Sequence, residues 1–280
     1  MTDIATLLKE PVAEAKMVIC GGGHVALQVV KLAKLCGFRV TVLEDRPEFG
    51  EKARNAGADE VQCGDFVSLL EALQSDEDTF FVVLTRGHKY DRDCMAAAIK
   101  KPHAYLGMIG SKRKVGIVHE ALVKEGVTEE EWREVHAPIG LQIAAETPEE
   151  IAVSILGEII QVKNTNGHDY GMTKEVMNAL RHLHADPDSE KRAVLATITK
   201  KTGSAPRGAG ARMIVYEDGT ITGTIGGGKG EADVITDAVS FMGEGKDEAE
   251  KRVKVVMTSD AAAQDGLVCG GEIEVLLEIL

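Results

Sequence analysis

The fold is decided by residues 16–26, which read KMVICGGGHVA. An apolar run from Lys16 to Cys20 stops at three glycines, and residues 24–36 then carry apolar side chains at helical spacing until Gly37. The pattern predicts a buried strand, a tight turn and a helix. Glycines at such a turn let a phosphate approach the backbone, and the start of the helix offers it free N–H groups.

The same alternation of strand and helix continues through the first half of the chain. Further strands are expected at residues 39–43, 60–62, 80–84 and 104–109, and further helices at 4–15, 51–56, 67–73, 91–99, 112–125 and 148–162. Near-continuous apolar strands between helices are typical of a parallel sheet that helices cover on both faces. Residues 1–165 are therefore expected to form an α/β domain with a Rossmann-like parallel sheet.

The character of the sequence changes after residue 162. Residues 163–171 are polar, contain glycine and lack periodicity, which indicates a linker. One helix is expected beyond them, at 173–184, followed by strands at 193–199, 211–216, 220–224, 254–258 and 272–279, with a hairpin turn at 217–219. The prediction for residues 170–280 is a smaller α+β domain.

Composition excludes several classes of partner. The 280 residues include 32 basic and 45 acidic side chains, for a net charge of -13, which disfavours nucleic acid and anionic membrane surfaces. The chain has no apolar run of about 18 residues and no signal-peptide pattern, so a cytoplasmic protein is expected. Its five cysteines form no C-x-x-C pair, which favours reduced thiols over disulfides or a structural zinc site.

Candidate cofactor-binding residues follow the strands of the first half, because ligands of open α/β sheets lie at the carboxyl ends of strands. The candidates are Gly21, Gly23, His24, Glu44, Asp45, Arg86, His88, Gly110, Ser111 and Arg113. Glu44 and Asp45 stand about where an acid meets a ribose hydroxyl, and the glycine, hydroxyl and cations after the fifth strand suit a phosphate. The alternatives are a Rossmann-like fold that binds no dinucleotide, a solvated basic helix start and a surface histidine.

The second half offers three further glycine-bearing segments. Residues 202–212 combine small residues with hydroxyls and arginines, residues 226–231 form a glycine turn that enters a helix, and a thiol precedes two glycines at 269–271. The candidates here are Ser204, Arg207, Arg212, Gly227, Gly228 and Cys269. As a thiolate, Cys269 is also the candidate metal ligand. A flexible connection, a plain tight turn and an inert thiol are the alternatives.

These segments together resemble the xanthine dehydrogenase accessory family, XdhC/CoxI. In the first half the resemblance is carried by ICGGGHVA, VTVLEDRPEFG, TRGHKYDRD, YLGMIGSKRK, HAPIGL and TPEEIAVSILGEI. In the second half it is carried by ATITKKTGSAPRGAGARMIV, GTIGGGKGEAD and CGGEIEVLLEI. The first set resembles the family's Rossmann domain and the second its CoxI-type domain, so the resemblance covers nearly the whole chain.

The resemblance implies a chaperone that binds molybdenum cofactor, as molybdopterin or its dinucleotide form. Such a chaperone keeps the cofactor while a sulfido ligand replaces an oxo ligand, and delivers it to an apo molybdenum hydroxylase of the xanthine dehydrogenase type. A cysteine desulfurase supplies the sulfur, and homodimers are common in the family.

Two features depart from the family's pattern. Many members place the CoxI-type domain first, whereas here it follows the Rossmann-like domain. Many also have a cysteine in the second domain's glycine turn, where this chain has Lys229, which leaves Cys269 as the thiol candidate of that domain.

A different class of protein, an NAD(P)-dependent oxidoreductase, is the alternative. It is suggested by the glycine turn of residues 21–26 together with Glu44. Such an enzyme also needs a proton-transfer group beside the nicotinamide, for which His88 and His136 are the candidates.

Overall fold

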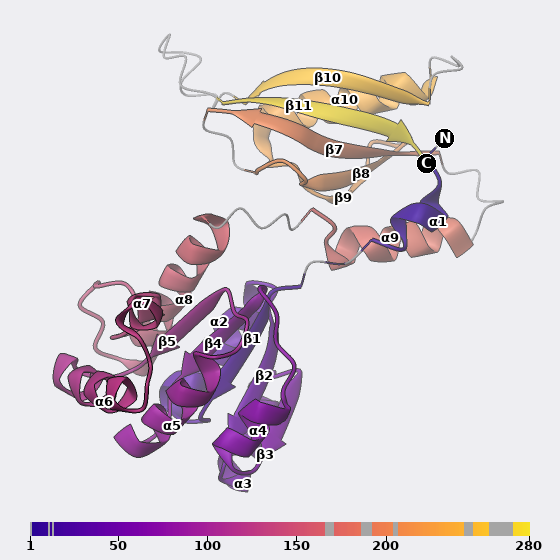
Figure 1. The fold of residues 1–280 in the computed structure, drawn as a ribbon. Helices are drawn as coiled ribbons and strands as arrows, with labels where there is room; N and C mark the ends of the chain where they lie inside the picture. Colours follow the sequence, from indigo (N-terminus) through magenta and orange to yellow (C-terminus); the bar gives the residue numbers. More distant parts are fainter. Residues whose placement is uncertain are drawn as a thin grey trace. The chain divides into compact units, whose positions relative to one another are not determined.

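Within the residues that the structure describes, six parallel strands form the sheet of the first unit (Figure 1). The structure is a computed structural model, and it describes residues 2–10, 12, 14–165, 171–185, 192–203, 207–243, 249–257 and 271–280. The chain divides into two units, one of them Glu14–His168 and the other Met1–Ala13 together with Asp169–Leu280.

The first unit confirms the predicted Rossmann-like sheet. Its strands are β1 (Lys16–Cys20), β2 (Arg39–Glu44), β3 (Glu60–Cys63), β4 (Thr79–Val83), β5 (Tyr105–Met108) and β6 (Val135–His136). They lie in the order β3-β2-β1-β4-β5-β6, and every neighbouring pair is parallel. The order reverses between β1 and β4, because β2 and β3 lie to one side of β1 and the later strands to the other.

Helices connect these strands and bury their faces. They are α2 (His24–Leu35), α3 (Pro47–Asn55), α4 (Phe66–Ala72), α5 (His88–Ala98), α6 (Lys112–Lys124), α7 (Glu129–Arg133) and α8 (Pro148–Thr165). Side chains from α4, α5 and α6 pack with Val18, Phe81 and Val83 in one core. α2 and α8 pack against each other. β4 is buried along its whole length, as a strand covered on both faces must be.

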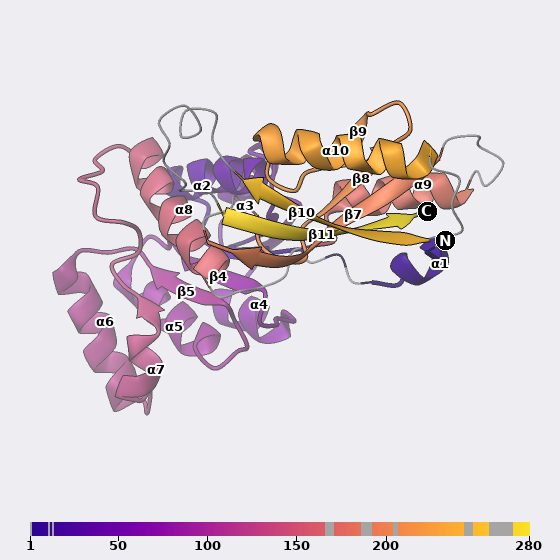
Figure 2. The same ribbon diagram turned by 90° about the horizontal axis from the view of Figure 1, so that it is seen from above.

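The second unit has the α+β composition expected from the sequence. In its described part, five antiparallel strands lie in the order β10-β11-β7-β8-β9 (Figure 1), and Figure 2 shows the same sheet from above. The strands are β7 (Ala193–Thr202), β8 (Arg212–Tyr216), β9 (Ile221–Gly223), β10 (Glu250–Met257) and β11 (Gly271–Ile279). α10 (Gly228–Gly243) packs on one face of this sheet, and α9 (Lys174–Ala185) with α1 (Ile4–Leu7) packs on the other. Gly219 adopts a φ of +80° in the hairpin turn between β8 and β9.

The N-terminal segment differs from its expectation. The helix expected at residues 4–15 is wrong in length, because α1 spans only Ile4–Leu7. Leu7 is buried with side chains of α9, and the Thr2 N–H donates to the Ile279 carbonyl oxygen at 2.8 Å. These residues therefore belong with the second unit, although the sequence pattern places them in a first domain of residues 1–165.

Two short elements, β6 and α7, were not expected from the sequence, and part of the expected linker lies outside the residues that the structure describes. Val135 and His136 form a short sixth strand beside β5, where no strand was expected from the sequence. α7 was not expected either, although Thr128 and Glu131 form the capping box that begins it. Of the expected linker, residues 166–170 lie outside the described residues. No helix in the described ranges is both long and apolar enough to cross a membrane.

Candidate functional site

The glycine loop after β1 packs closely against the rest of the chain at two positions and leaves open space at the third. Gly21 has a φ of +106°, and a Cβ there would lie 2.6 Å from the Leu84 carbonyl oxygen. A Cβ on Gly22 would lie 3.0 Å from the Phe49 carbonyl oxygen. Gly23 has an ordinary φ of -72°, and a Cβ on it would meet nothing within 4 Å. The first two glycines therefore let the chain pack on itself, whereas Gly23 faces open space at the start of α2.

Glu44 ends β2 and is fully buried, with 0% exposure. Its Oε2 accepts a hydrogen bond from the Gly22 N–H at 2.6 Å, and its Oε1 accepts one from the Arg46 Nε at 2.9 Å. The backbone N–H groups of Asp45 and Arg46 also donate to Oε1, each at 3.1 Å. An acid at this position commonly accepts a ribose hydroxyl. In this chain the carboxylate is already engaged by the protein's own donors, and it ties the end of β2 to the glycine loop.

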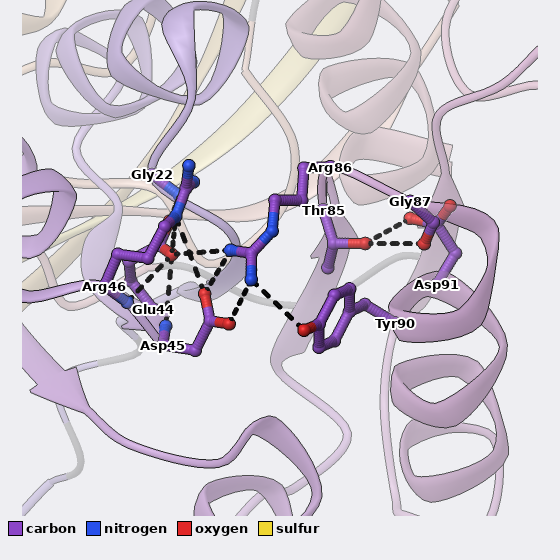
Figure 3. Close-up of polar contacts among 9 residues, drawn as sticks. All are labelled: Gly22, Glu44, Asp45, Arg46, Thr85, Arg86, Gly87, Tyr90 and Asp91. Carbon is purple, nitrogen blue, oxygen red and sulfur yellow. Dashed lines mark hydrogen bonds and ion pairs between the residues drawn. The ribbon is translucent and has the colours of Figure 1, made fainter.

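Asp45 and Arg86 form a bidentate ion pair at the carboxyl edge of the parallel sheet (Figure 3). The two terminal nitrogens of Arg86 each lie 2.6 Å from one Asp45 oxygen. Arg86 also donates to the Tyr90 hydroxyl at 3.1 Å and lies 4.7 Å from the centre of that ring. Hydrogen bonds from Arg86 lower the pKa of Asp45, against the opposing effect of burial. Asp45 is therefore firmly ionised at neutral pH.

A second ion pair fixes the starts of α5 and α6. Asp91 is fully buried, accepts a hydrogen bond from the Thr85 hydroxyl at 2.6 Å and pairs with Lys114. Burial raises the pKa of Asp91, and the contacts with Lys114 and Thr85 oppose that rise. The Ser111 hydroxyl accepts the Lys114 N–H and caps α6. Lys114 thus has a structural partner, while Ser111 and Arg113 stay exposed at the start of the helix.

A third group of polar side chains lies around β6. The Tyr105 hydroxyl donates to Glu158 at 2.5 Å, the Gly140 N–H donates to the same oxygen at 2.8 Å, and His136 Nδ1 lies 3.4 Å from the other oxygen. The His136 ring stacks on Tyr105 with 4.4 Å between ring centres. Burial acts to raise the pKa of Glu158, but the hydrogen bonds from His136, Tyr105 and Gly140 outweigh it and lower this pKa. Glu158 therefore holds the segment 136–140 against α8.

The glycine turn of the second unit is closed by a carboxylate of the same chain. Gly226, Gly227 and Gly228 have φ values of +135°, +73° and +70°, which other residues rarely adopt. Glu231 accepts hydrogen bonds from the Thr224 hydroxyl at 2.5 Å and from the N–H groups of Ile225 and Gly227 at 3.0 and 3.1 Å. Glu231 thus engages two backbone N–H groups of this turn, and the Gly226 N–H donates to the Thr224 hydroxyl at 3.0 Å.

Glu231 should make the stability of the second unit depend on pH. Burial acts to raise the pKa of Glu231, but its hydrogen bonds outweigh this and lower the pKa from the ordinary 4.5. The stabilisation is therefore present above pH 4.5 and is lost as the pH falls through the folded-state pKa. At neutral pH, Glu231→Gln should lower the free energy of unfolding by about 1–2 kcal/mol.

Urea unfolding at neutral and acidic pH measures this effect. The difference between the parent chain and Glu231→Gln should shrink as the pH falls below 4.5. Asp233→Asn, which changes an exposed carboxylate on the same helix, is the control and should have little effect at either pH. A difference for Glu231→Gln that is equal at all pH values would contradict the prediction.

The structure brings the candidates of the first unit to one edge of the sheet. Gly21, Gly23 and His24 follow β1, Glu44 and Asp45 lie at the end of β2, Arg86 and His88 follow β4, and Gly110, Ser111 and Arg113 follow β5. His24 and His88 are exposed at the first positions of their helices.

Of the candidate binding residues in the second unit, only some lie within the described residues. Arg212 pairs with Glu10 at 2.5 Å, and Arg207 is exposed. Ser204 and Cys269 lie outside the described residues. Among the residues that are described, no three His, Cys, Asp or Glu side chains gather as a metal site.

Sequence reasoning missed several side chains that organise the edge. Arg46 pairs with Glu44 and lies 3.6 Å from the centre of the Phe49 ring, and its position directly after two acids was a usable signal. Glu158 had no such signal, because its partners Tyr105 and Gly140 are distant in sequence and meet it only in the fold.

The strand order and the loops at its carboxyl edge define a Rossmann-type α/β protein joined to an antiparallel α+β unit. Residues 17–159 match the family described as the XdhC Rossmann domain, and residues 188–255 match the XdhC and CoxI family. The chain belongs to the XdhC/CoxI family, as the resemblance indicated.

Three curated relatives share parts of the chain. It is 36% identical to YqeB of Escherichia coli (strain K12) over 150 residues, 53% of this chain and 27% of that protein. It is 28% identical to a probable xanthine dehydrogenase subunit of Bacillus subtilis (strain 168) over 152 residues, 53% of this chain and 43% of that protein. It is 44% identical to the molybdenum cofactor insertion chaperone PaoD of Escherichia coli (strain K12) over 59 residues, 21% of this chain and 19% of that protein. The matched segments thus span less than half the length of each relative.

Proposed function

We propose that this chain is an accessory chaperone that binds molybdenum cofactor, supports its sulfuration and delivers it to a molybdenum hydroxylase of the xanthine dehydrogenase type. The observation that carries the proposal is the match of both units, residues 17–159 and 188–255, to one family. A relative named as a molybdenum cofactor insertion chaperone supports it further. The proposed partners are the apo hydroxylase, a cysteine desulfurase and a second copy of this chain.

The carboxyl edge of the parallel sheet suits the phosphate end of such a cofactor. Gly23 leaves open space at the start of a 12-residue helix, whose first N–H groups favour an anion. Arg86, Ser111 and Arg113 add exposed donors after β4 and β5. These residues would hold the cofactor in the first unit. In the second unit, Arg207 and Cys269 remain the proposed contacts.

The rival function, an NAD(P)-dependent oxidoreductase, gains no support from the geometry. Its main sequence signal was Glu44 as the acceptor of a ribose hydroxyl. Glu44 is fully buried, and both of its oxygens accept hydrogen bonds from the protein itself. A hydride-transfer site would therefore have to use Asp45, the neighbouring acid, whose two oxygens accept hydrogen bonds from Arg86.

Anaerobic purification followed by mass spectrometry tests the proposal. We expect a molybdenum-bearing pterin to accompany the chain, and the loaded chain to activate an apo hydroxylase in a purified mixture. NADH titration under the same conditions is the comparison. A chain that binds NADH, takes up no pterin and leaves the apo hydroxylase inactive would contradict the proposed function.

A further inference from the structure

Exposed apolar side chains gather on one side of the first unit. Of the large apolar side chains that are exposed in its described part, all but Leu35 lie on α6 or within residues 141–153. Their exposed fractions lie between 38% and 53%. Figures 1 and 2 show α6, α7 and α8 together on the side of the sheet where β5 lies. The exposed apolar side chains are Ile117 and Val123 on α6, and Leu141, Ile143 and Val153 in the second segment. Apolar surface gathered in this way marks an interaction site.

The loop that precedes α8 is held in place by hydrogen bonds at both of its ends. The Leu141 N–H donates to the Ser154 carbonyl oxygen at 3.1 Å. The N–H groups of Glu146 and Thr147 donate to Glu150 Oε2 at 2.8 and 3.0 Å. The apolar side chains of this loop are therefore presented on a fixed backbone. Such a surface loses little conformational entropy when a partner covers it.

The two groups of apolar side chains carry charges of opposite sign. On α6 the exposed charged side chains are three cations and one acid, namely Lys112, Arg113, Lys124 and Glu120. Residues 141–153 have three exposed acids and no cation, and the acids are Glu146, Glu149 and Glu150. Two α6 faces brought together would oppose cations to cations, and two segments 141–153 would oppose acids to acids. α6 therefore complements residues 141–153 in both apolar character and charge.

We infer that a second copy of this chain covers this surface, with α6 of each copy against residues 141–153 of the other. One chain carries both complementary halves on the same side, so a twofold axis forms the contact twice and leaves neither half exposed. The inference deepens the proposed association of two copies. It rests on that part of the proposed function and on no property of the cofactor.

Size-exclusion chromatography of the full chain with light scattering is the first test. The parent chain should elute with the mass of two chains, because a twofold contact closes on itself. A monomer would overturn the inference. Assemblies that grow with concentration would overturn it as well, because they indicate a head-to-tail contact that does not close.

Substitution of one apolar side chain in each half is the second test. Ile117→Asp and Ile143→Asp should each raise the dissociation constant of the dimer by about tenfold or more, because an apolar anchor is lost and a charge is buried. Analytical ultracentrifugation over a dilution series measures the constant. If either variant dimerises like the parent chain, the inference is wrong.

Leu35→Asp is the matched control for these variants. Leu35 is 84% exposed at the end of α2 and lies outside the proposed surface. Its substitution should leave the dissociation constant unchanged, and an equal loss of association in this control would overturn the inference. All three side chains are exposed, so the variants should stay folded, which thermal unfolding checks.

Charge reversal tests the pairing of the two halves. Lys112→Glu combined with Lys124→Glu reverses the charge of α6, and Glu146→Lys combined with Glu149→Lys reverses that of the other half. Each pair of substitutions should weaken the dimer. The four together should restore it, because the halves then attract each other with exchanged signs. A chain with all four that associates no better than either pair overturns the inference.

Pterin retention and hydroxylase activation by the parent chain are measured separately. Retention and activation together with a dimer that these variants leave intact sink the inference alone. A dimer that the variants dissociate, without pterin retention or hydroxylase activation by the parent chain, sinks the proposed cofactor function and leaves the inference standing.

Discussion

Replacing Gly23 by aspartate should leave the chain folded and remove most of its affinity for a phosphate-bearing ligand. Gly23 has an ordinary φ of -72°, and a Cβ there meets nothing within 4 Å, so the larger residue fits without strain. The position is the N-cap of α2, where aspartate is itself a favourable residue. The added carboxylate would occupy the phosphate position and repel the ligand.

The expected loss follows from the contacts that the carboxylate displaces. Charge-assisted hydrogen bonds contribute about 1.5–3 kcal/mol, which corresponds to roughly 10- to 150-fold in affinity. Binding of molybdenum cofactor and of ADP to the variant measures the loss, and urea unfolding checks the fold. Gly23→Asn is the control, because asparagine has the size of aspartate without its charge. Equal affinities for the parent chain and a folded Gly23→Asp variant would remove the glycine loop from the site.

Cys269→Ser should abolish cofactor retention or activation of the hydroxylase while the chain stays folded and associated. The prediction rests on the sequence, in which the thiol precedes two glycines with little bulk beside it. Glycines leave backbone N–H groups accessible to stabilise a thiolate. The thiolate is the form that ligates a soft metal or carries a transferable sulfur. Serine keeps the size of the side chain but cannot provide either chemistry at neutral pH.

Cys36→Ser is the matched control for this experiment. Cys36 is an exposed thiol at the end of α2, and it should be replaceable with no effect on either function. Both variants are loaded with cofactor anaerobically and then mixed with apo hydroxylase. If Cys269→Ser loads and activates like the parent chain, the thiol has no part in the site. The arginine and glycine loops would then carry it.

The parallel sheet of the first unit could be predicted because each of its strong elements has a local signal. The apolar runs of β1, β4 and β5 are bounded by turns and helices, and βα alternation fixes a parallel sheet. β6 lacked such a signal, since two residues are too few to show a periodicity. α1 was predicted too long because the apolar residues of 4–15 fit a helical pattern that breaks off after Leu7.

The candidate site could be located but its electrostatic pairing could not. The rule that loops after parallel strands share one edge places Glu44, Asp45 and Arg86 together. It does not say that Glu44 turns inward to the Gly22 N–H while Asp45 reaches Arg86, since neighbouring acids have the same chemistry in the sequence. In the fold it is Glu44 that is buried, beside Gly22 and Phe49.

The position of β11 has a consequence for the order in which the second unit can be completed. β11 is the last of the described strands of this unit, yet it lies inside the sheet and pairs with β10 on one side and β7 on the other. Until residues 271–279 have been synthesised, β10 has no hydrogen-bonding neighbour in the described sheet. The pairing of β11 with β7 joins segments that are distant in the chain, and such pairing is slow because loop closure costs entropy before the contacts form. The Rossmann-like unit, complete by residue 168, can therefore fold before the second sheet is closed.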